Sequence, residues 1–235
     1  MKITKHLRKN WFKYGLETLV VVVGVLGAFS LNNWNEYRKD RAKESELLLQ
    51  IQDNIRRNMD ELVQELNTGD TMVVGSMKRI LRAIEDPDVY RDSIVDDFNV
   101  IYLVTDPPFT YAGYNALQDA SLEIIENPVL RDEIVTLFDV RYPWLQAVID
   151  ELEITIIKPS SGTFVYDNFY RDFSNGAADG RLVPNNYDEL MRSEKLKNIA
   201  SQNLGWTRWF MGHKRNILRE SEVVLSLIEQ ELASK

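Results

Sequence analysis

One apolar stretch limits what this chain can fold into more than any other feature. Leu19–Phe29 contains no polar side chain, and a tryptophan stands on each side of it, at Trp11 and Trp34. Indole rings prefer the headgroup region at both faces of a bilayer. A helix between the two tryptophans would rise roughly 35 Å, enough to cross a membrane. The sequence therefore predicts a transmembrane helix over residues 14–33.

A cleaved secretory signal is the main alternative. Glu17 lies inside the apolar segment, so the charge-free run is shorter than the usual span of about 20 residues. The basic start of the chain and the small residues Ala28 and Ser30 also fit a signal peptide. Aromatic anchors before the span, and a helical pattern that continues past Ser30, favour a retained anchor. A buried core helix is the third interpretation.

Basic residues predict the orientation of the span. Five Lys/Arg precede it without an acid, whereas the four that follow from Arg38 to Lys43 alternate with Asp and Glu. Cytoplasmic flanks carry the excess of Lys and Arg. We therefore expect residues 1–13 to form a basic cytoplasmic tail and residues 34–235 an extracytoplasmic, periplasmic domain of a single-pass inner-membrane protein.

Composition narrows the partners of that domain. After Glu17 the chain carries 23 Lys/Arg against 35 Asp/Glu, a net charge of −12. Such a balance argues against binding nucleic acid, which needs a basic face. The chain has no cysteine, which excludes a disulfide framework and a thiol nucleophile. The expected partners are the lipid bilayer, through residues 14–33, and a protein or a second copy of the chain.

Hydrophobic periodicity predicts an all-α fold, in which the span continues into a long helix and then into an elongated antiparallel helical bundle. Apolar residues recur at three- and four-residue steps after Trp34, at Leu48, Ile51, Ile55, Met59, Leu62 and Leu66. A break is expected at Thr68–Thr71, followed by helices ending at Glu85, over Ile94–Val104 and over Tyr111–Glu126. Proline at 87, 107 and 108 supports these boundaries.

The second half contains the clearest helix start and one long irregular region. Asn127–Pro128 combines a preferred N-cap with the residue preorganised for the first helical position. The helix that follows is expected to kink at Pro143. Residues 159–184 are rich in turn residues but hold five aromatics, so we expect a long loop that packs on the bundle. A last helix is predicted from Ser193 to Ala233.

No motif indicates catalysis, a metal or a cofactor. His6 and His213 are the only histidines, and neither has a nearby carboxylate at helical spacing. The aspartates between Asp86 and Asp97 lack the glycine and spacing of a calcium loop. We expect a protein that is not an enzyme and has no cofactor.

Aromatic residues form the only candidate pocket. They could converge if the last helix packs on the central ones, and core or membrane-proximal packing is the simpler interpretation. The candidate pocket residues are Tyr111, Tyr114, Tyr142, Trp144, Trp206, Trp209 and Phe210.

The span supplies candidates for assembly. Gly24 and Ala28 are four residues apart, a spacing that lets two helices approach closely, although small residues are common in spans. Glu17 either reaches the interface or faces a partner helix.

The residues around the span resemble a known family. A glutamate opens the aliphatic segment, and Asn32-Asn33-Trp34-Asn35-Glu36 closes it. This block is similar to the opening of a family of uncharacterised bacterial single-span membrane proteins, although Leu16 separates Gly15 from Glu17. The resemblance is looser over Thr110–Leu137. It implies a retained anchor and a helical domain of unknown activity, with roles in insertion or assembly for Glu17 and residues 32–36.

These observations lead to two functional expectations. The first is a membrane-anchored, non-enzymatic helical protein that acts through protein–protein interaction, as a subunit or accessory of an envelope complex. The second is a ligand-binding sensor whose aromatic pocket signals through a partner. The 13 residues before the span are too few for a signalling domain, so the sensor would also need a partner.

Overall fold

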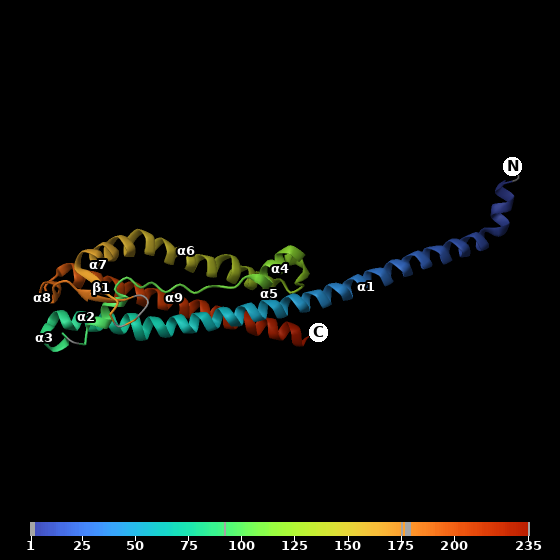
Figure 1. Ribbon diagram of the computed structural model, residues 1–235. Helices are drawn as coiled ribbons and strands as arrows, with labels where there is room; N and C mark the ends of the chain where they lie inside the picture. The colour runs from blue at the N-terminus through green and yellow to red at the C-terminus, as the bar shows by residue number, and fades with distance from the viewer. Residues whose placement is uncertain (1–2, 92, 175, 177–179, 235) are drawn as a thin grey trace.

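The computed structural model describes residues 3–91, 93–174, 176 and 180–234, with side chains from Leu16 onward. The predicted basic tail and its aromatic anchors therefore lie outside the described side chains. Within this range the fold is all-α apart from one short hairpin, as predicted. The molecule is long and narrow, and its first helix projects far beyond one end of the body (Figure 1).

The first helical rod runs from the N-terminus to the far end of the body. It consists of α1 (Ile3–Thr68), the π-helical η1 (Gly69–Val74) and α2 (Gly75–Glu85). The break expected at Thr68–Thr71 is wrong, because Thr68 and Gly75 keep right-handed helical dihedrals. A Cβ on Gly69 would lie 3.5 Å from the side chain of Met211. This distance is an ordinary van der Waals contact, so Gly69 is a helical residue that faces α9 and does not form a turn. The rod ends as predicted before Pro87, where α3 (Pro87–Tyr90) follows.

The second rod begins at the predicted cap. The Asn127 side chain accepts hydrogen bonds from the amides of Val129 and Leu130, and Pro128 occupies the first turn. The rod comprises α5 (Pro128–Val135), the π-helical η4 (Thr136–Arg141), α6 (Tyr142–Leu152), the π-helical η5 (Glu153–Gly162) and α7 (Thr163–Asn168). Helical dihedrals continue through Arg141 and Tyr142 next to the predicted kink at Pro143, so the helix is widened there rather than broken.

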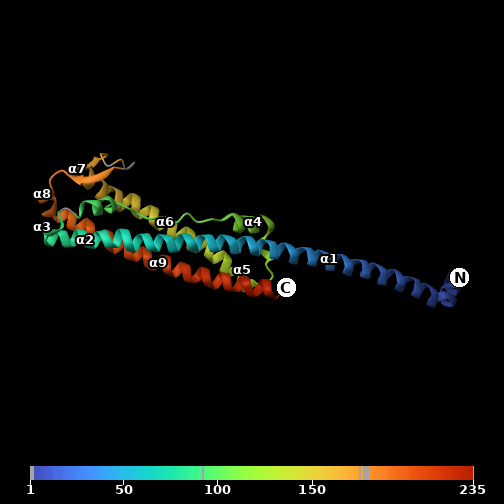
Figure 2. The ribbon, with the colours of Figure 1, turned by 60° about the horizontal axis from the view of Figure 1, so that its bottom comes forward.

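The third rod is α9 (Glu194–Ala233), capped by Ser193 as expected. It runs antiparallel to the first rod, since Glu229 bonds to Gln52 near one end and Lys214 bonds to Glu65 further along. It is also antiparallel to the second rod, because Glu231 contacts Asn127 while Ser221 contacts Tyr142. Figure 2 shows the three rods side by side, with the C-terminus near the point where α1 leaves the body.

A crossover connects the first and second rods. It contains the 3₁₀ turn η2 (Val95–Val100), then residues 103–111 without regular secondary structure, then α4 (Ala112–Ala120) and the 3₁₀ turn η3 (Leu122–Ile124). We call residues 103–111 the strap, and it follows the length of the bundle (Figure 1). The two predicted helices here are too long. The second ends at Ala120 because Ser121 adopts a φ of 107°, which a helix cannot accommodate.

The predicted irregular loop over residues 159–184 is largely regular. The second rod continues through Asn168, and β1 (Phe169–Asp172) pairs antiparallel with β2 (Arg181–Pro184), before the short α8 (Tyr187–Met191). The Leu182 amide donates to Asn99 Oδ1 at 3.0 Å, which attaches the hairpin to η2. The expected packing is partial: Phe164 and Phe169 are buried, whereas Tyr166, Tyr170 and Phe173 are exposed.

The body contains two hydrophobic cores in series. The proximal core, nearer the projecting helix, includes the predicted stripe residues Leu48, Ile51, Ile55 and Leu62 of α1. It packs them against α4, α5, α6 and the C-terminal half of α9. The distal core joins α2, η2, the hairpin and the N-terminal half of α9 around residues such as Met77, Phe98 and Leu196. The first and third rods run through both cores, which makes one continuous body.

Candidate functional site

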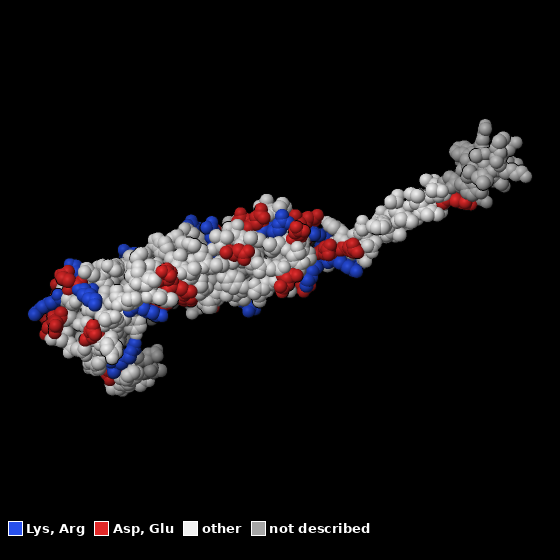
Figure 3. All heavy atoms as spheres, turned by 90° about the horizontal axis from the view of Figure 1, so that it is seen from above, with Lys and Arg blue, Asp and Glu red and all other residues white. Residues whose placement is uncertain are grey.

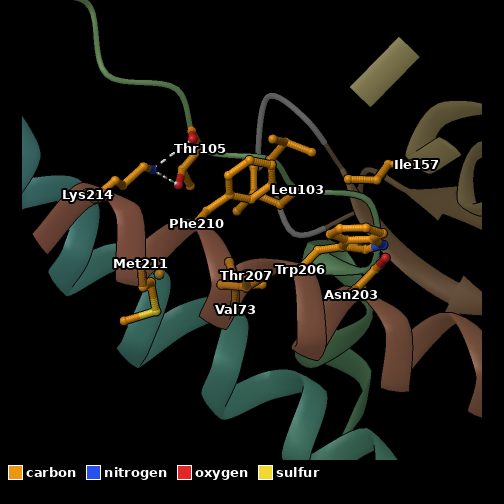
Figure 4. A pocket seen from close by; sticks show the side chains of 12 residues that line it. Val73, Leu103, Thr105, Ile157, Asn203, Trp206, Thr207, Phe210, Met211 and Lys214 are labelled. Carbon is orange, nitrogen blue, oxygen red and sulfur yellow. Dashed lines mark hydrogen bonds between the residues drawn. The ribbon is translucent and has the colours of Figure 1, made fainter. Parts of the chain in front are cut away.

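A small pocket lies at the boundary between the two cores, beneath the start of the strap (Figure 4). Its walls come from η1, the strap, η5 and α9, so both π-helical segments at this level contribute. The lining residues are Gly69, Val73, Leu103, Val104, Thr105, Ile157, Asn203, Trp206, Thr207, Phe210, Met211 and Lys214. Its volume of about 20 Å³ has room for about one water molecule. With the strap in this position, a larger ligand does not fit.

A buried lysine closes one side of this pocket. Lys214 is only 2% exposed, and its ammonium donates to Glu65 Oε2 at 3.0 Å and to the carbonyl and hydroxyl oxygens of Thr105 at 2.9 and 3.0 Å. Burial lowers the pKa of Lys214, and the Glu65 carboxylate opposes this effect. An ammonium group has three protons to donate, and these contacts use them all. The lysine therefore fastens the strap to α1 and α9 rather than serving as a free nucleophile.

Three tryptophans gather on the surface beside the pocket. Trp209 lies 6.1 Å from Trp144 and 6.3 Å from Trp206 between ring centroids, and His213 packs 4.2 Å from Trp209. Trp144 and Trp209 are each 40% exposed. A shallow apolar groove, lined by Ile156, Gln202, Gly205, Trp206 and Trp209, runs along this side of α9. Tryptophan is enriched among the residues that dominate binding energy at protein interfaces.

A basic cleft lies on the opposite side of α9. Lys78 from α2 and Arg208 and Arg215 from α9 line it together with Asp70, over a floor of Val74 and Met211. All three cations are exposed. Within the described part of the chain, none of them forms an ion pair, although acidic residues outnumber basic ones in this domain. The cleft therefore carries a net positive charge, with three cations against the single carboxylate of Asp70.

The predicted aromatic pocket is divided between two places. Tyr111, Tyr114 and Tyr142 pack with Phe109 and Phe138 in the proximal core, where Phe109 stacks on Tyr142 and Tyr114 stacks on Phe138. Burial raises the pKa of Tyr142 to about 12 and also raises that of Tyr114, whose hydroxyl donates to Asp139. The other predicted residues belong to the boundary: Trp206 and Phe210 line the pocket, and Trp209 and Trp144 lie on the surface.

The span candidates lie on an isolated helix. Glu17, Gly24 and Ala28 are on its exposed surface, and a Cβ added at Gly24 would meet nothing within 4 Å. In the closing block, the Asn32 amide donates to Glu36 Oε1 at 3.0 Å. The Arg38 guanidinium lies 5.3 Å from the ring centre of the exposed Trp34. Asn33 is exposed and Asn35 half-buried, so within the described residues this block belongs to the helix surface rather than to a core.

A polar junction that the sequence analysis missed secures the projecting helix to the body. Arg41 pairs with the fully buried Glu44 and with Glu126, and donates to the carbonyl oxygen of Ile124 at 3.0 Å. Glu44 also accepts from the Glu126 amide, and Tyr37 donates to the Glu126 carboxylate. A charged residue on the apolar stripe at Glu44 was the available signal. The junction sets the direction in which α1 leaves the body.

Among residues with described positions, no group of three His, Cys, Asp or Glu side chains could hold a metal ion. His213 packs on tryptophans instead.

The comparisons with other proteins add no assignment. The chain matches no known family model, and no curated protein or solved structure is significantly similar to it.

Proposed function

We propose that this chain is a single-span membrane protein that holds a protein-binding surface at a fixed distance from the bilayer and acts by binding rather than by catalysis. The observation that carries the proposal is the continuity of the first rod. One unbroken helix runs from an entirely exposed apolar segment into the buried stripe of the proximal core.

The exposure of residues 16–33 supports a lipid environment. Leu19, Val20 and Phe29 are 58 to 66% exposed, and the remaining residues of the segment are exposed around the whole helix. A helix that is apolar on all sides needs a protein core or a membrane around it. No core of the described chain reaches this segment.

The rod sets the distance at which the surface is presented. Gly69 of the rod lies beside Thr207 and Met211 of α9, at the level of the tryptophan groove and the basic cleft. At 1.5 Å per residue, the 35 residues from Trp34 to Gly69 correspond to roughly 50 Å. Most of this length is braced by the bundle and the polar junction. We infer that the surface meets partners well away from the membrane, on the extracytoplasmic side that the basic flank predicts.

Crosslinking in native membranes tests the proposal. An amine-reactive crosslinker applied before mild detergent extraction should yield a defined protein adduct, either another protein or a second copy of this chain. Inserting seven residues after Glu36, before the polar junction, adds about two helical turns, or roughly 10 Å, with nearly the same helical phase. This variant should fold normally and lose an adduct with another protein, because the surface moves away from that partner. An adduct between two copies of this chain should persist, because both surfaces move together. A chain that stays monomeric without any adduct contradicts the proposal.

The sensor remains the second candidate, supported by the pocket under the strap. A ligand would have to displace residues 103–105 to enter, which would connect binding to a structural change. Thermal-shift screening separates the candidates. A small-molecule shift that Trp206→Ala abolishes, and that Trp209→Ala leaves intact, favours the sensor, because only Trp206 lines that pocket.

A further inference from the structure

The N-terminal half of α9 has an unusual charge for this domain. From Lys195 to Arg219 the sequence holds six Lys/Arg and no Asp or Glu, whereas the chain after Glu17 carries a net charge of −12. Lys214 is buried and paired, but Arg208 and Arg215 are exposed. These two arginines are seven residues apart, so they point to the same side of the helix.

Two glycines open the outer face of this helix. Gly205 and Gly212 are also seven residues apart, and a Cβ added at either would meet nothing within 4 Å. Glycine inside a helix is destabilising, so packing within this chain does not explain either residue. Because these two residues have no side chains, a second backbone could approach the α9 backbone closely at this line of the helix. We call the line through Gly205 and Gly212 the glycine ridge.

The hollows on each side of this ridge differ in chemistry. On one side lies the apolar groove with Ile156, Trp206 and Trp209, and on the other lies the basic cleft with Lys78, Arg208 and Arg215. Together they form one seat along the glycine ridge, which we call the α9 seat. A binding partner that is complementary to this seat has an apolar stripe along one side, facing the groove, and carboxylates along the other side, facing the cleft.

We propose that the α9 seat binds an acidic amphipathic helix of a partner protein. This inference rests on the proposed function and specifies the chemistry of its partner. The positive charge of the seat complements carboxylates. Its apolar groove can accept leucine-sized side chains, and the glycine ridge can accept one helix backbone. The lipid of the membrane that the chain spans is excluded as the occupant, because the seat lies roughly 50 Å along the rod from Trp34.

Peptide binding to the full-length chain in phosphatidylcholine nanodiscs tests the inference. The probe is a labelled 21-residue helix with leucines on one face and glutamates on the other. Its controls are the same peptide with lysines in place of glutamates, and a scrambled glutamate peptide without the stripe. By fluorescence anisotropy, the acidic amphipathic peptide should bind at least tenfold more tightly than either control.

Two variants separate charge from shape. The double variant Arg208→Glu/Arg215→Glu should lose at least tenfold in affinity and then prefer the lysine peptide. Gly205→Leu/Gly212→Leu leaves the charge unchanged and fills the ridge, so it should also lose at least tenfold. These positions are on the surface, and unchanged circular dichroism melts would confirm that the variants fold.

The outcomes that overturn the inference are specific. Equal binding of the three peptides, no binding, or unchanged affinity in both variants would exclude the acidic helix. Tighter binding of a single-stranded oligonucleotide would replace it with a nucleic-acid site. Self-association that both variants abolish would make a second copy the occupant. If the peptide test fails but membrane crosslinking still gives an adduct, the α9 seat is wrong and the proposed function stands.

Discussion

At the scale of single residues, buried polar side chains on α1 organise the bundle as much as its apolar stripe does. Asn58 donates to the carbonyl oxygen of Thr110 at 3.1 Å and accepts from the Thr110 amide at 2.7 Å. Asn54 accepts from the amide of Gly113 at 2.6 Å. The Asn58 contacts satisfy backbone groups of the strap, and the Asn54 contact satisfies an amide in the first turn of α4, which has no partner within that helix. In the sequence both asparagines look like ordinary helix-surface residues.

Gly113 permits the closest backbone approach among the described glycines, and its replacement should be costly. A Cβ there would lie 2.7 to 2.9 Å from backbone atoms of Gln50 and Ile51, and backbone cannot move aside as a side chain can. We expect Gly113→Ala to destabilise the protein by about 2 kcal/mol in urea unfolding, as overpacked sites do. Gly162→Ala is the control, because nothing lies within 4 Å of that position. Equal stability of the two variants would contradict this packing.

Tyr142 should make the protein sensitive to alkaline pH. Burial raises its pKa from 10.0 to about 12, so the folded state holds the phenol proton between these values while the unfolded state releases it. Stability from this residue is therefore intact below pH 10 and falls by about 2–3 kcal/mol as the pH rises to 12. Urea unfolding at several pH values measures this, and Tyr142→Phe should reduce the slope. An unchanged slope in that variant would rule out the contribution.

At the scale of elements, local sequence signals correctly predicted the helix ends that local contacts stabilise. Asn127-Pro128, Ser193 and the stop before Pro87 mark real helix ends, because each cap is satisfied within a few residues. The elements that were wrong depend on distant residues. Gly69 is helical where it faces α9, and the hairpin within residues 159–184 is attached to η2 by the bond from Leu182 to Asn99. No local pattern contains that information.

The strap should depend on the buried ion pair at its start. Lys214→Ala would leave Glu65 and the Thr105 carbonyl without their donor, and we expect a loss of about 3 kcal/mol in urea unfolding. Replacing both partners, as Lys214→Met/Glu65→Leu, should recover a large part of this loss, since no unpaired charge remains. If the double variant is less stable than Lys214→Ala, this expectation is wrong. The ion pair would then stabilise the fold by more than the free energy that burying its two charges costs.

At the scale of the whole molecule, the chain consists of a projecting apolar helix and a body whose two cores do not include it. Both cores begin at or after Leu47, and the polar junction begins at Tyr37. Figure 3 shows the contrast between the two parts: the described part of the projecting helix is almost entirely white, whereas blue and red residues are scattered over the body. The aromatic residues proposed for a pocket belong to two different levels of the bundle, in the proximal core and at the boundary between the cores.

Removing the anchor should release a folded soluble body. We expect residues 34–235, expressed alone, to leave the membrane fraction and keep their helical circular dichroism. Their melting midpoint should lie within a few degrees of the full chain in detergent, because the deleted residues contribute to neither core. Full-length protein extracted by carbonate, or an aggregated 34–235 fragment, would contradict this separation of roles.

The sequence alone was sufficient to predict an all-helical chain with one segment apolar enough to cross a membrane. These features follow from the hydrophobic period and from helix caps, which act over a few residues. The residues that share a surface were decided by contacts across the fold. Trp144 and Trp209 meet because the second and third rods run antiparallel. Lys78 joins Arg208 and Arg215 because the first rod continues through η1 without a break. Residues that far apart come together only through packing, which no single helical period encodes.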